Sequence, residues 1–190
     1  MRGIAAIFIA CLIGAAGGCG KIERKTDAER ARDLVDEIAR EPDVRRLERA
    51  LTQDSASRLK KFTREERQEY LAGAVKRLGR YADAEIRVTR RPGERRFTVG
   101  LRKPETESIC LAIEPNRDGV PALDLSESID DWATIIEWSR LVAKKMSSEN
   151  AGRPPLTIGG IEMLTTFEAK DFRVAMEVSF PPCVEDRAEP

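Results

Sequence analysis

Two kinds of hydrophobic pattern follow each other along the chain, and each predicts a different secondary structure. Between residues 26 and 78, apolar side chains recur every three or four positions, the spacing of one helix face. Two stretches there, Thr26-Asp-Ala-Glu29 and Thr63-Arg-Glu-Glu66, have the threonine-to-glutamate spacing that caps a helix N-terminus. Glu41-Pro42 interrupts the first run. This region is therefore predicted to form amphipathic helices.

From residue 86 the hydrophobic period changes to two. Ile86 and Val88 alternate with polar residues, Pro92-Gly93 marks a turn, and the apolar face returns over residues 97–101. Residues 109–113 and 120–125 supply two further short apolar runs. This pattern predicts an antiparallel β-meander.

A longer helical pattern follows Leu125. Ser128-Ile-Asp-Asp131 is predicted to cap this helix, and Arg153-Pro-Pro155 to lie beyond its end. Residues 163–167 and 172–180 are predicted to close the chain as a hairpin around Ala169-Lys-Asp171. The predicted fold class is α+β: N-terminal helices packed on an antiparallel β-meander, then a long helix and a C-terminal β-hairpin.

Residues 1–18 have the layout of an export signal, with Arg2, an apolar run and the small residues before Cys19. The apolar run covers residues 4–16 and is shorter than the ~20 residues needed to span a bilayer. A signal that ends in small residues directly before cysteine resembles that of the bacterial lipoproteins. The resemblance implies that Cys19 is lipidated and that residues 19–25 form a short tether. The 172 residues left after residues 1–18 have the length of one ordinary domain, so residues 26–190 are predicted to form a single α+β domain.

This resemblance also implies a subcellular localisation, the periplasm-facing side of a cell-envelope membrane. Many such lipoproteins carry aspartate after the lipidated cysteine when they stay in the inner membrane, and Gly20 here favours the outer membrane instead. Export would keep the chain from nucleic acid, and 33 basic against 33 acidic residues give no basic excess to attract it. We therefore expect no nucleic-acid partner.

The chain contains no histidine, which is the usual general base near neutral pH and the commonest metal ligand. Ser57-Arg-Leu-Lys60 matches the S-x-x-K string of penicillin-binding proteins, but its companion motifs are missing. Asp130 and Asp131 are adjacent on a helix and point in different directions. We expect a protein without catalytic residues, cofactor or metal.

Cys110 and Cys183 are the only cysteines beyond residue 19. An oxidising compartment favours a disulfide between them. The alternative is a buried thiol at Cys110 and an exposed one at Cys183.

Two features are candidate binding surfaces. Basic residues gather around the predicted hairpin turn, and Arg90, Arg91, Arg95 and Arg96 are the candidate contacts to anionic lipid or an acidic partner. The alternative is a solvated basic edge. Trp132 and Trp138 lie about 120° apart on the long helix. Trp138 is thus a candidate aromatic anchor, unless both indoles are buried.

The order of elements over residues 43–126 resembles the cone-shaped nuclear transport factor two-like fold, which often encloses a pocket. Two hypotheses of function follow. In the first, a non-catalytic membrane-anchored lipoprotein docks an envelope protein as an interaction or assembly module. In the second, the domain binds a small lipid or glycan ligand in a cavity behind the sheet.

Overall fold

A computed structural model describes residues 25–104, 106–150, 156–158, 161–163, 168–173 and 176–183. The predicted export signal, Cys19 and residues 20–24 of the predicted tether lie outside the described residues. The elements, in chain order, are α1 (Asp27–Arg40), α2 (Val44–Ala50), α3 (Gln53–Leu59), α4 (Arg64–Gly79), β1 (Glu85–Arg90), β2 (Phe97–Arg102), β3 (Ile109–Pro115), β4 (Pro121–Asp124), α5 (Ser126–Asn150), β5 (Leu156–Ile158), β6 (Ile161–Met163) and α6 (Ala169–Arg173).

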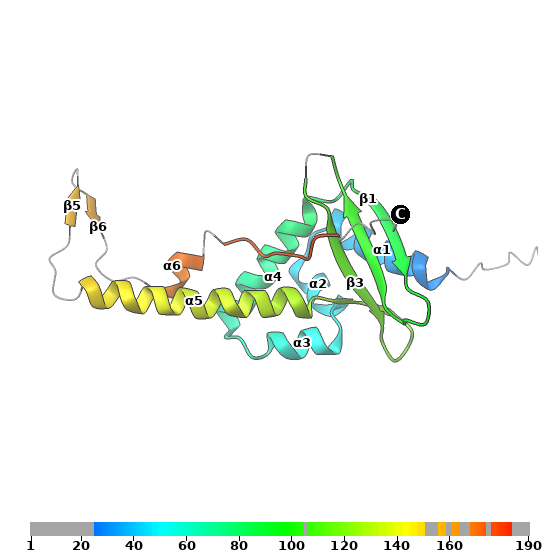
Figure 1. The fold of residues 1–190 in the computed structure, drawn as a ribbon, viewed down its shortest axis with the longest axis horizontal. Coiled ribbons are helices and arrows are strands. Elements are labelled where there is room, and N and C mark those ends of the chain that lie inside the picture. The colour runs from blue at the N-terminus through cyan, green and yellow to red at the C-terminus, as the bar shows by residue number, and fades with distance from the viewer. Residues whose placement is uncertain are drawn as a thin grey trace, which may run out of the picture.

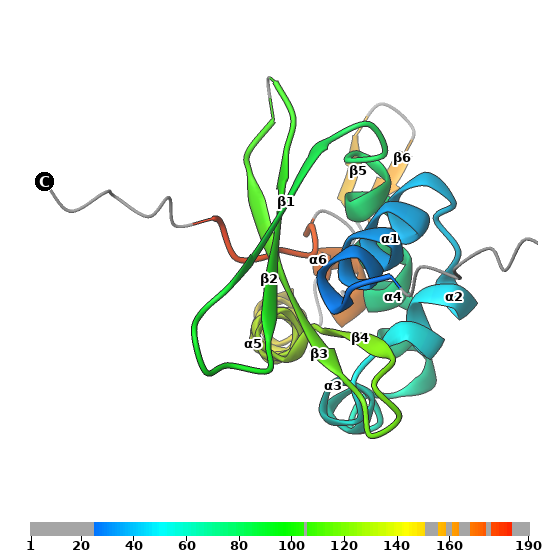
Figure 2. The same cartoon turned by 90° about the vertical axis from the view of Figure 1, so that its right-hand side faces the viewer.

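The predicted α+β class is confirmed: helices precede an antiparallel sheet, and a long helix follows it. The sheet has the order β1-β2-β3-β4 of a meander, with Val88 opposite Val99 and Val99 opposite Leu111. Helices α1, α2 and α4 lie on one side of the sheet, and α1 packs against β1, β2 and β4 (Figure 2).

Both predicted capping boxes are formed. The backbone N–H groups of Glu29 and Glu66 donate to the hydroxyls of Thr26 and Thr63. The two glutamate carboxylates accept from the threonine backbone N–H groups in return. These contacts satisfy N–H groups that the first turns of α1 and α4 leave free.

The core lies between α1, α4, α5 and one face of the sheet. The period-two pattern directs its apolar residues inward, so that alternate side chains of β2 and β3 are buried. The largest fully buried side chains come from helices α1 to α4, from Tyr81 just after α4 and from the sheet: Tyr70, Tyr81, Ile38, Leu47, Leu59, Leu71, Leu78, Leu101, Ile109, Leu111, Ile113 and Leu123.

Helix α5 begins two residues earlier than the predicted cap at Ser128. The backbone N–H of Ser126 donates to Asp124 Oδ1, and the N–H of Ile129 to the carbonyl of Leu125. The Ser128 hydroxyl instead donates to the carbonyl of Ser179 at 2.6 Å and accepts from the Tyr70 hydroxyl at 3.1 Å. Ser128 is therefore a buried link between α4, α5 and the C-terminal segment.

The C-terminal hairpin is placed differently from its prediction. The two paired strands are β5 and β6, and Ala169-Lys-Asp171 is part of helix α6 rather than a turn. Of the predicted hairpin strands, residues 164–167 lie outside the described residues, and no strand forms over 176–180. The prediction of a hairpin strand over residues 172–180 is wrong; Val178 and Phe180 fill the core from a segment without strand pairing.

Residues 176–183, which we call the C-terminal tail, extend the edge of β3 that β4 leaves open. β4 pairs only with Ala112–Pro115, while Pro182 pairs with Ile109 and the Cys110 N–H donates to the Pro181 carbonyl. Cys110 and Cys183 form the predicted disulfide, which lies over Gly100 on the other face of the sheet. The tail is thus bonded to β3 covalently and by backbone hydrogen bonds.

Candidate functional site

Helix α5 presents two large apolar side chains to solvent. Trp132 and Ile136 are buried on the face toward the core, whereas Trp138 is 47% and Leu141 is 68% exposed. Trp138 and Leu141 are three residues apart, so they are neighbours on the helix surface. We call this pair the α5 patch. Figure 1 shows that α5 extends well away from the sheet.

The structure therefore separates the two tryptophans. Trp132 is 4% exposed, and its ring packs against Tyr70 at 6.2 Å between centroids. Trp138 lies on a different side of the helix, as the 120° separation requires. The alternative in which both indoles are buried is wrong.

Cationic residues adjoin the α5 patch on its C-terminal side. Lys144 and Lys145 are exposed, and Lys145 reaches Glu149 only at 4.0 Å. Arg140 instead donates to Glu66 on α4 at 2.6 Å. The exposed surface around Trp138 and Leu141 carries these two lysines and also the carboxylate of Glu137, which lies four residues before Leu141.

The contact between Arg140 and Glu66 fixes α5 against the start of α4. Glu66 is 5% exposed. Burial raises the pKa of this carboxyl, but hydrogen bonds from Thr63 and Arg140 outweigh burial and hold the pKa below its usual value. The buried carboxylate is thus charged and paired, so the patch stands on a helix with a defined position.

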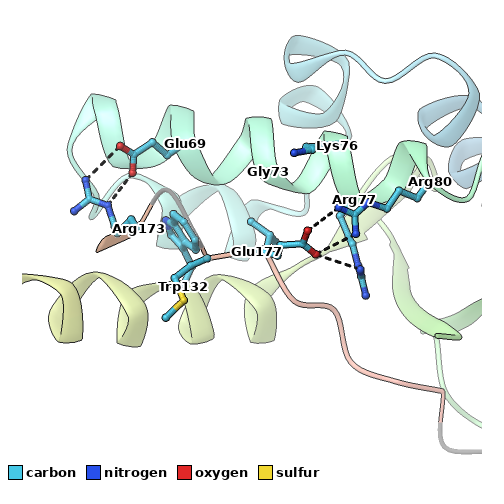
Figure 3. Close-up of a pocket in the computed structure, with 10 residues that line it drawn as sticks. Glu69, Gly73, Lys76, Arg77, Arg80, Trp132, Arg173 and Glu177 are labelled. Atoms are coloured by element: carbon cyan, nitrogen blue, oxygen red, sulfur yellow. Dashed lines mark hydrogen bonds and ion pairs between the residues drawn. The ribbon is translucent and has the colours of Figure 1, made fainter. Parts of the chain in front are cut away.

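A cavity of about 330 Å³ lies between α4, Trp132 on α5 and the chain from Arg173 to Val178. Figure 3 shows an ion pair at each of two sides of it. Arg173 donates to Glu69 at 2.8 Å, and Arg80 holds Glu177 through two hydrogen bonds of 2.6 and 3.1 Å. Glu177 belongs to the tail, which therefore forms one wall.

The charges of the cavity are dominated by cations. Hydrogen bonds and the charge of Arg80, with the charges of Arg77 and Lys76, lower the pKa of Glu177. Apolar contact surface comes from Trp132, Met176 and Val178. The cavity combines an apolar wall with a positive one and is not an enclosed apolar pocket of the kind that holds a lipid chain.

The four candidate arginines of the β1–β2 turn do not act alike. Arg96 pairs with Asp124 and lies 3.6 Å from Glu114, so it belongs to the sheet. Arg90 lies over the Phe97 ring at 5.1 Å and donates to the Glu94 carbonyl. Arg91 and Arg95 are exposed and have no partner among the described residues. Only these last two are free to meet an anion.

In the S-x-x-K and paired-aspartate patterns, Ser57, Asp130 and Asp131 make structural contacts. The Ser57 hydroxyl donates to the Gln53 carbonyl at 2.7 Å within α3. Asp130 pairs with Arg58, and Asp131 accepts from the Ser179 hydroxyl at 3.1 Å. Ser57, Asp130 and Asp131 are thus each engaged with a different neighbour, and Lys60 is exposed.

Sequence reasoning missed the cavity. Its local signal was present, because Lys76, Arg77 and Arg80 are three cations within the end of α4. Such residues are also the normal complement of a helix C-terminus. What distinguishes them is Glu177, about a hundred residues away in the chain, and that contact has no sequence signature.

Within the described segments, no group of three His, Cys, Asp or Glu side chains is placed to hold a metal ion. None of the described helices is both long and apolar enough to cross a membrane. Comparison with protein-family models, with curated proteins and with solved structures gives no match for this chain. The function is therefore argued from the geometry of the α5 patch, the cavity and the arginine turn.

Proposed function

We propose that this protein is a non-catalytic lipoprotein of the cell envelope, anchored through a lipidated Cys19 and docking a protein partner on helix α5. The observation that carries the docking role is the α5 patch. An indole and a leucine side chain exposed within one helical turn expose apolar surface to water, and aromatic residues are enriched among interface hot spots.

Charge at the rim of the patch indicates the chemistry of the partner. Lys144 and Lys145 lie three and four residues after Leu141 on α5, and the Lys144 side chain has no partner among the described residues. A complementary surface would offer an apolar pocket or ridge to Trp138 and Leu141, with carboxylates facing the two lysines. The proposed partner is therefore an envelope protein with an apolar surface edged by acidic residues.

The anchor proposal rests on the sequence before residue 25. The six residues from Gly20 to Lys25 reach at most about 20 Å, so a lipidated Cys19 would keep the domain close to the bilayer. The start of α1 and the far end of α5 lie at opposite ends of the molecule (Figure 1). The far end of α5 would then lie away from the membrane, and Gly20 favours the outer membrane.

The second hypothesis, a small lipid or glycan ligand behind the sheet, has less support. The space between α1, α4 and the sheet is filled by large buried side chains such as Tyr70, Tyr81 and Leu111. The cavity beside Trp132 has charged walls instead of a continuous apolar lining. These features favour docking over storage of a lipid chain.

The test is native mass spectrometry of the tagged, full-length protein released gently from its own membranes. We expect a stoichiometric protein companion with the wild type and none with Trp138→Ala/Leu141→Ala. Both side chains are solvent-exposed, so the double variant should keep the wild-type melting temperature. The matched control is Val120→Ala, which removes an exposed apolar side chain elsewhere and should retain the companion.

A companion that binds the double variant as well as the wild type would contradict docking through α5. The anchor has a separate test: Cys19→Ser should leave the protein without acyl chains and release it from the membrane fraction. A Cys19→Ser variant that stays acylated and membrane-bound would contradict lipidation at this residue.

A further inference from the structure

Two buried hydrogen-bond donors beside the cavity at Trp132 lack acceptors. The indole Nε1 of Trp132 and the Nε of Arg77 are buried and have no partner among the described residues. Buried polar groups in proteins are nearly always paired, so each orphaned donor requires an explanation. Both residues line the same cavity.

The cations at the cavity exceed its carboxylates. Lys76, Arg77, Arg80 and Arg173 line it, against Glu69 and Glu177. Glu69 is taken by Arg173 and Glu177 by Arg80. The terminal nitrogens of Arg77 donate to Glu177 and Glu107 at 3.4 and 3.5 Å, and the Lys76 side chain has no partner among the described residues. The groups left without an acceptor are therefore the Lys76 ammonium and the Nε of Arg77.

The remaining wall of the cavity is apolar. Met176 is 38% exposed, and with Trp132 and Val178 it contributes the apolar lining. A volume of about 330 Å³ is at the lower end of the range for small-molecule sites, ~300–1,000 Å³. The site would fit a short ligand with one charged end and one apolar end.

We propose that this cavity binds a small amphiphilic anion, a carboxylate or phosphate monoester with a short apolar group. Its oxyanion contacts Lys76 and Arg77, and its apolar group lies against Trp132, Met176 and Val178. This ligand site is separate from the α5 patch and does not depend on the docking role. Glu177 of the tail is the anion that already faces these cations, so it competes with the ligand for them.

Trp132 gives a direct readout, because the chain has only two tryptophans. In a Trp138→Phe background, the fluorescence of the purified full-length protein reports on the cavity alone. The titrants are butyrate, butyl phosphate, inorganic phosphate and, as the uncharged match, butan-1-ol. We expect saturable changes with butyrate or butyl phosphate, a weaker one with inorganic phosphate, and none with butan-1-ol. Whichever of butyrate and butyl phosphate binds with the higher affinity shows whether the site prefers a carboxylate or a phosphate.

Variants in the same background test the donor set. Lys76→Gln and Arg77→Gln should each weaken binding about tenfold or more, as expected for loss of a charge-assisted hydrogen bond. Glu177→Gln should tighten it, because a competing carboxylate is removed. Lys144→Gln, an exposed cation on α5, is the matched control and should leave affinity unchanged. Lys76 is exposed, so its variant keeps the test valid if Arg77→Gln fails to fold.

Four results would overturn the proposal. The first three are the absence of a saturable change with every anion, an equal change with butan-1-ol, and affinities that Lys76→Gln leaves unaltered. Weaker binding by Glu177→Gln would also overturn it, because the carboxylate and not the cations would then recognise the ligand.

Discussion

Gly73 lies where helix α4 comes closest to the C-terminal tail. A Cβ built at this position would be 2.7 Å from Cγ2 of Val178, a distance at which one of the two groups must move. Val178 is 3% exposed and β-branched, so its side chain has little freedom to turn away. The absence of a side chain at residue 73 is therefore what allows the tail to pack on α4.

Gly73→Ala should lower the free energy of unfolding by about 1–3 kcal/mol, the usual cost of forcing an extra group into a packed site. This reverses the ordinary effect, because alanine normally stabilises a helix interior by up to about 1 kcal/mol relative to glycine. Urea denaturation of the purified variant measures the change.

Gly79→Ala in the same helix is the matched control. Its Cβ would lie 3.5 Å from Pro42, an ordinary contact distance, so this variant should be neutral or slightly more stable. Equal stabilisation by both substitutions would contradict the tight packing of Val178 on Gly73.

At the scale of the element, a polar junction fixes the start of α5. The carboxylate of Asp124 accepts from the hydroxyl and backbone N–H of Ser126 and from the hydroxyl of buried Ser55. Arg96 pairs with the same carboxylate. This junction joins α3, β4 and α5, and it is why α5 begins at Ser126.

The junction predicts an acid-sensitive step in stability. Burial raises the pKa of Asp124, but the hydrogen bonds from Ser126 and Ser55 and the charge of Arg96 outweigh burial and lower it below 3.8. Between the lower folded-state pKa and the unfolded value of 3.8, the unfolded state therefore binds more protons than the folded state. The contribution of Asp124 to the free energy of unfolding is thus fully present above pH 3.8, and it is lost as the pH falls through the folded-state pKa. Urea midpoints measured from neutral to acid pH should show Asp124→Asn losing less stability in this window than the wild type.

The comparison variant for the acid step is Asp83→Asn. Asp83 is exposed and makes no side-chain contact among the described residues, so its removal should leave the pH profile of the wild type unchanged. If Asp124→Asn and the wild type lose stability in parallel, Asp124 does not cause the step.

Elements that are specified by residues near one another in the sequence were predictable. Features that depend on contacts between distant residues were not. The capping boxes at Thr26 and Thr63 and the alternation of β2 and β3 involve residues near in sequence, so their patterns were read correctly. The start of α5 was misplaced because Ser128 bonds Tyr70 and Ser179 instead of capping the helix. Nothing local distinguishes these two uses of a serine.

The candidate site was predictable only in part, for the same reason. The angle between the two tryptophans follows from helix geometry, but the packing of α4 decides that Trp132 is buried. Arg96 and Arg95 are neighbours in sequence, yet only Arg96 meets Asp124. The cavity depends on the contact of Glu177 with Arg77 and Arg80, which closes a long loop and leaves no mark in the sequence.

At the scale of the whole molecule, the proposed membrane contact and the proposed partner docking involve different parts of the protein. The start of α1 and the strands β1 and β2 lie at one end in Figure 1, and the end of α5 lies at the other. Arg91 and Arg95 on the β1–β2 turn have no partner among the described residues. With a lipidated Cys19 at the α1 end, these two arginines would face anionic headgroups, each contributing about 1 kcal/mol near such a surface.

The lipidated protein in vesicles with anionic lipid should therefore show slower amide exchange over residues 91–96 than in neutral vesicles, and high salt should remove the difference. Arg91→Gln/Arg95→Gln should abolish the slowing while leaving the protein anchored through Cys19. Lys144→Gln/Lys145→Gln removes the same charge from the opposite end and should behave as the wild type. Slowing that survives the arginine variant, or that also occurs in neutral vesicles, would place some other surface against the bilayer. The arginine turn would then be a solvated edge of the sheet, and the orientation of α5 would have to be set by its partner alone.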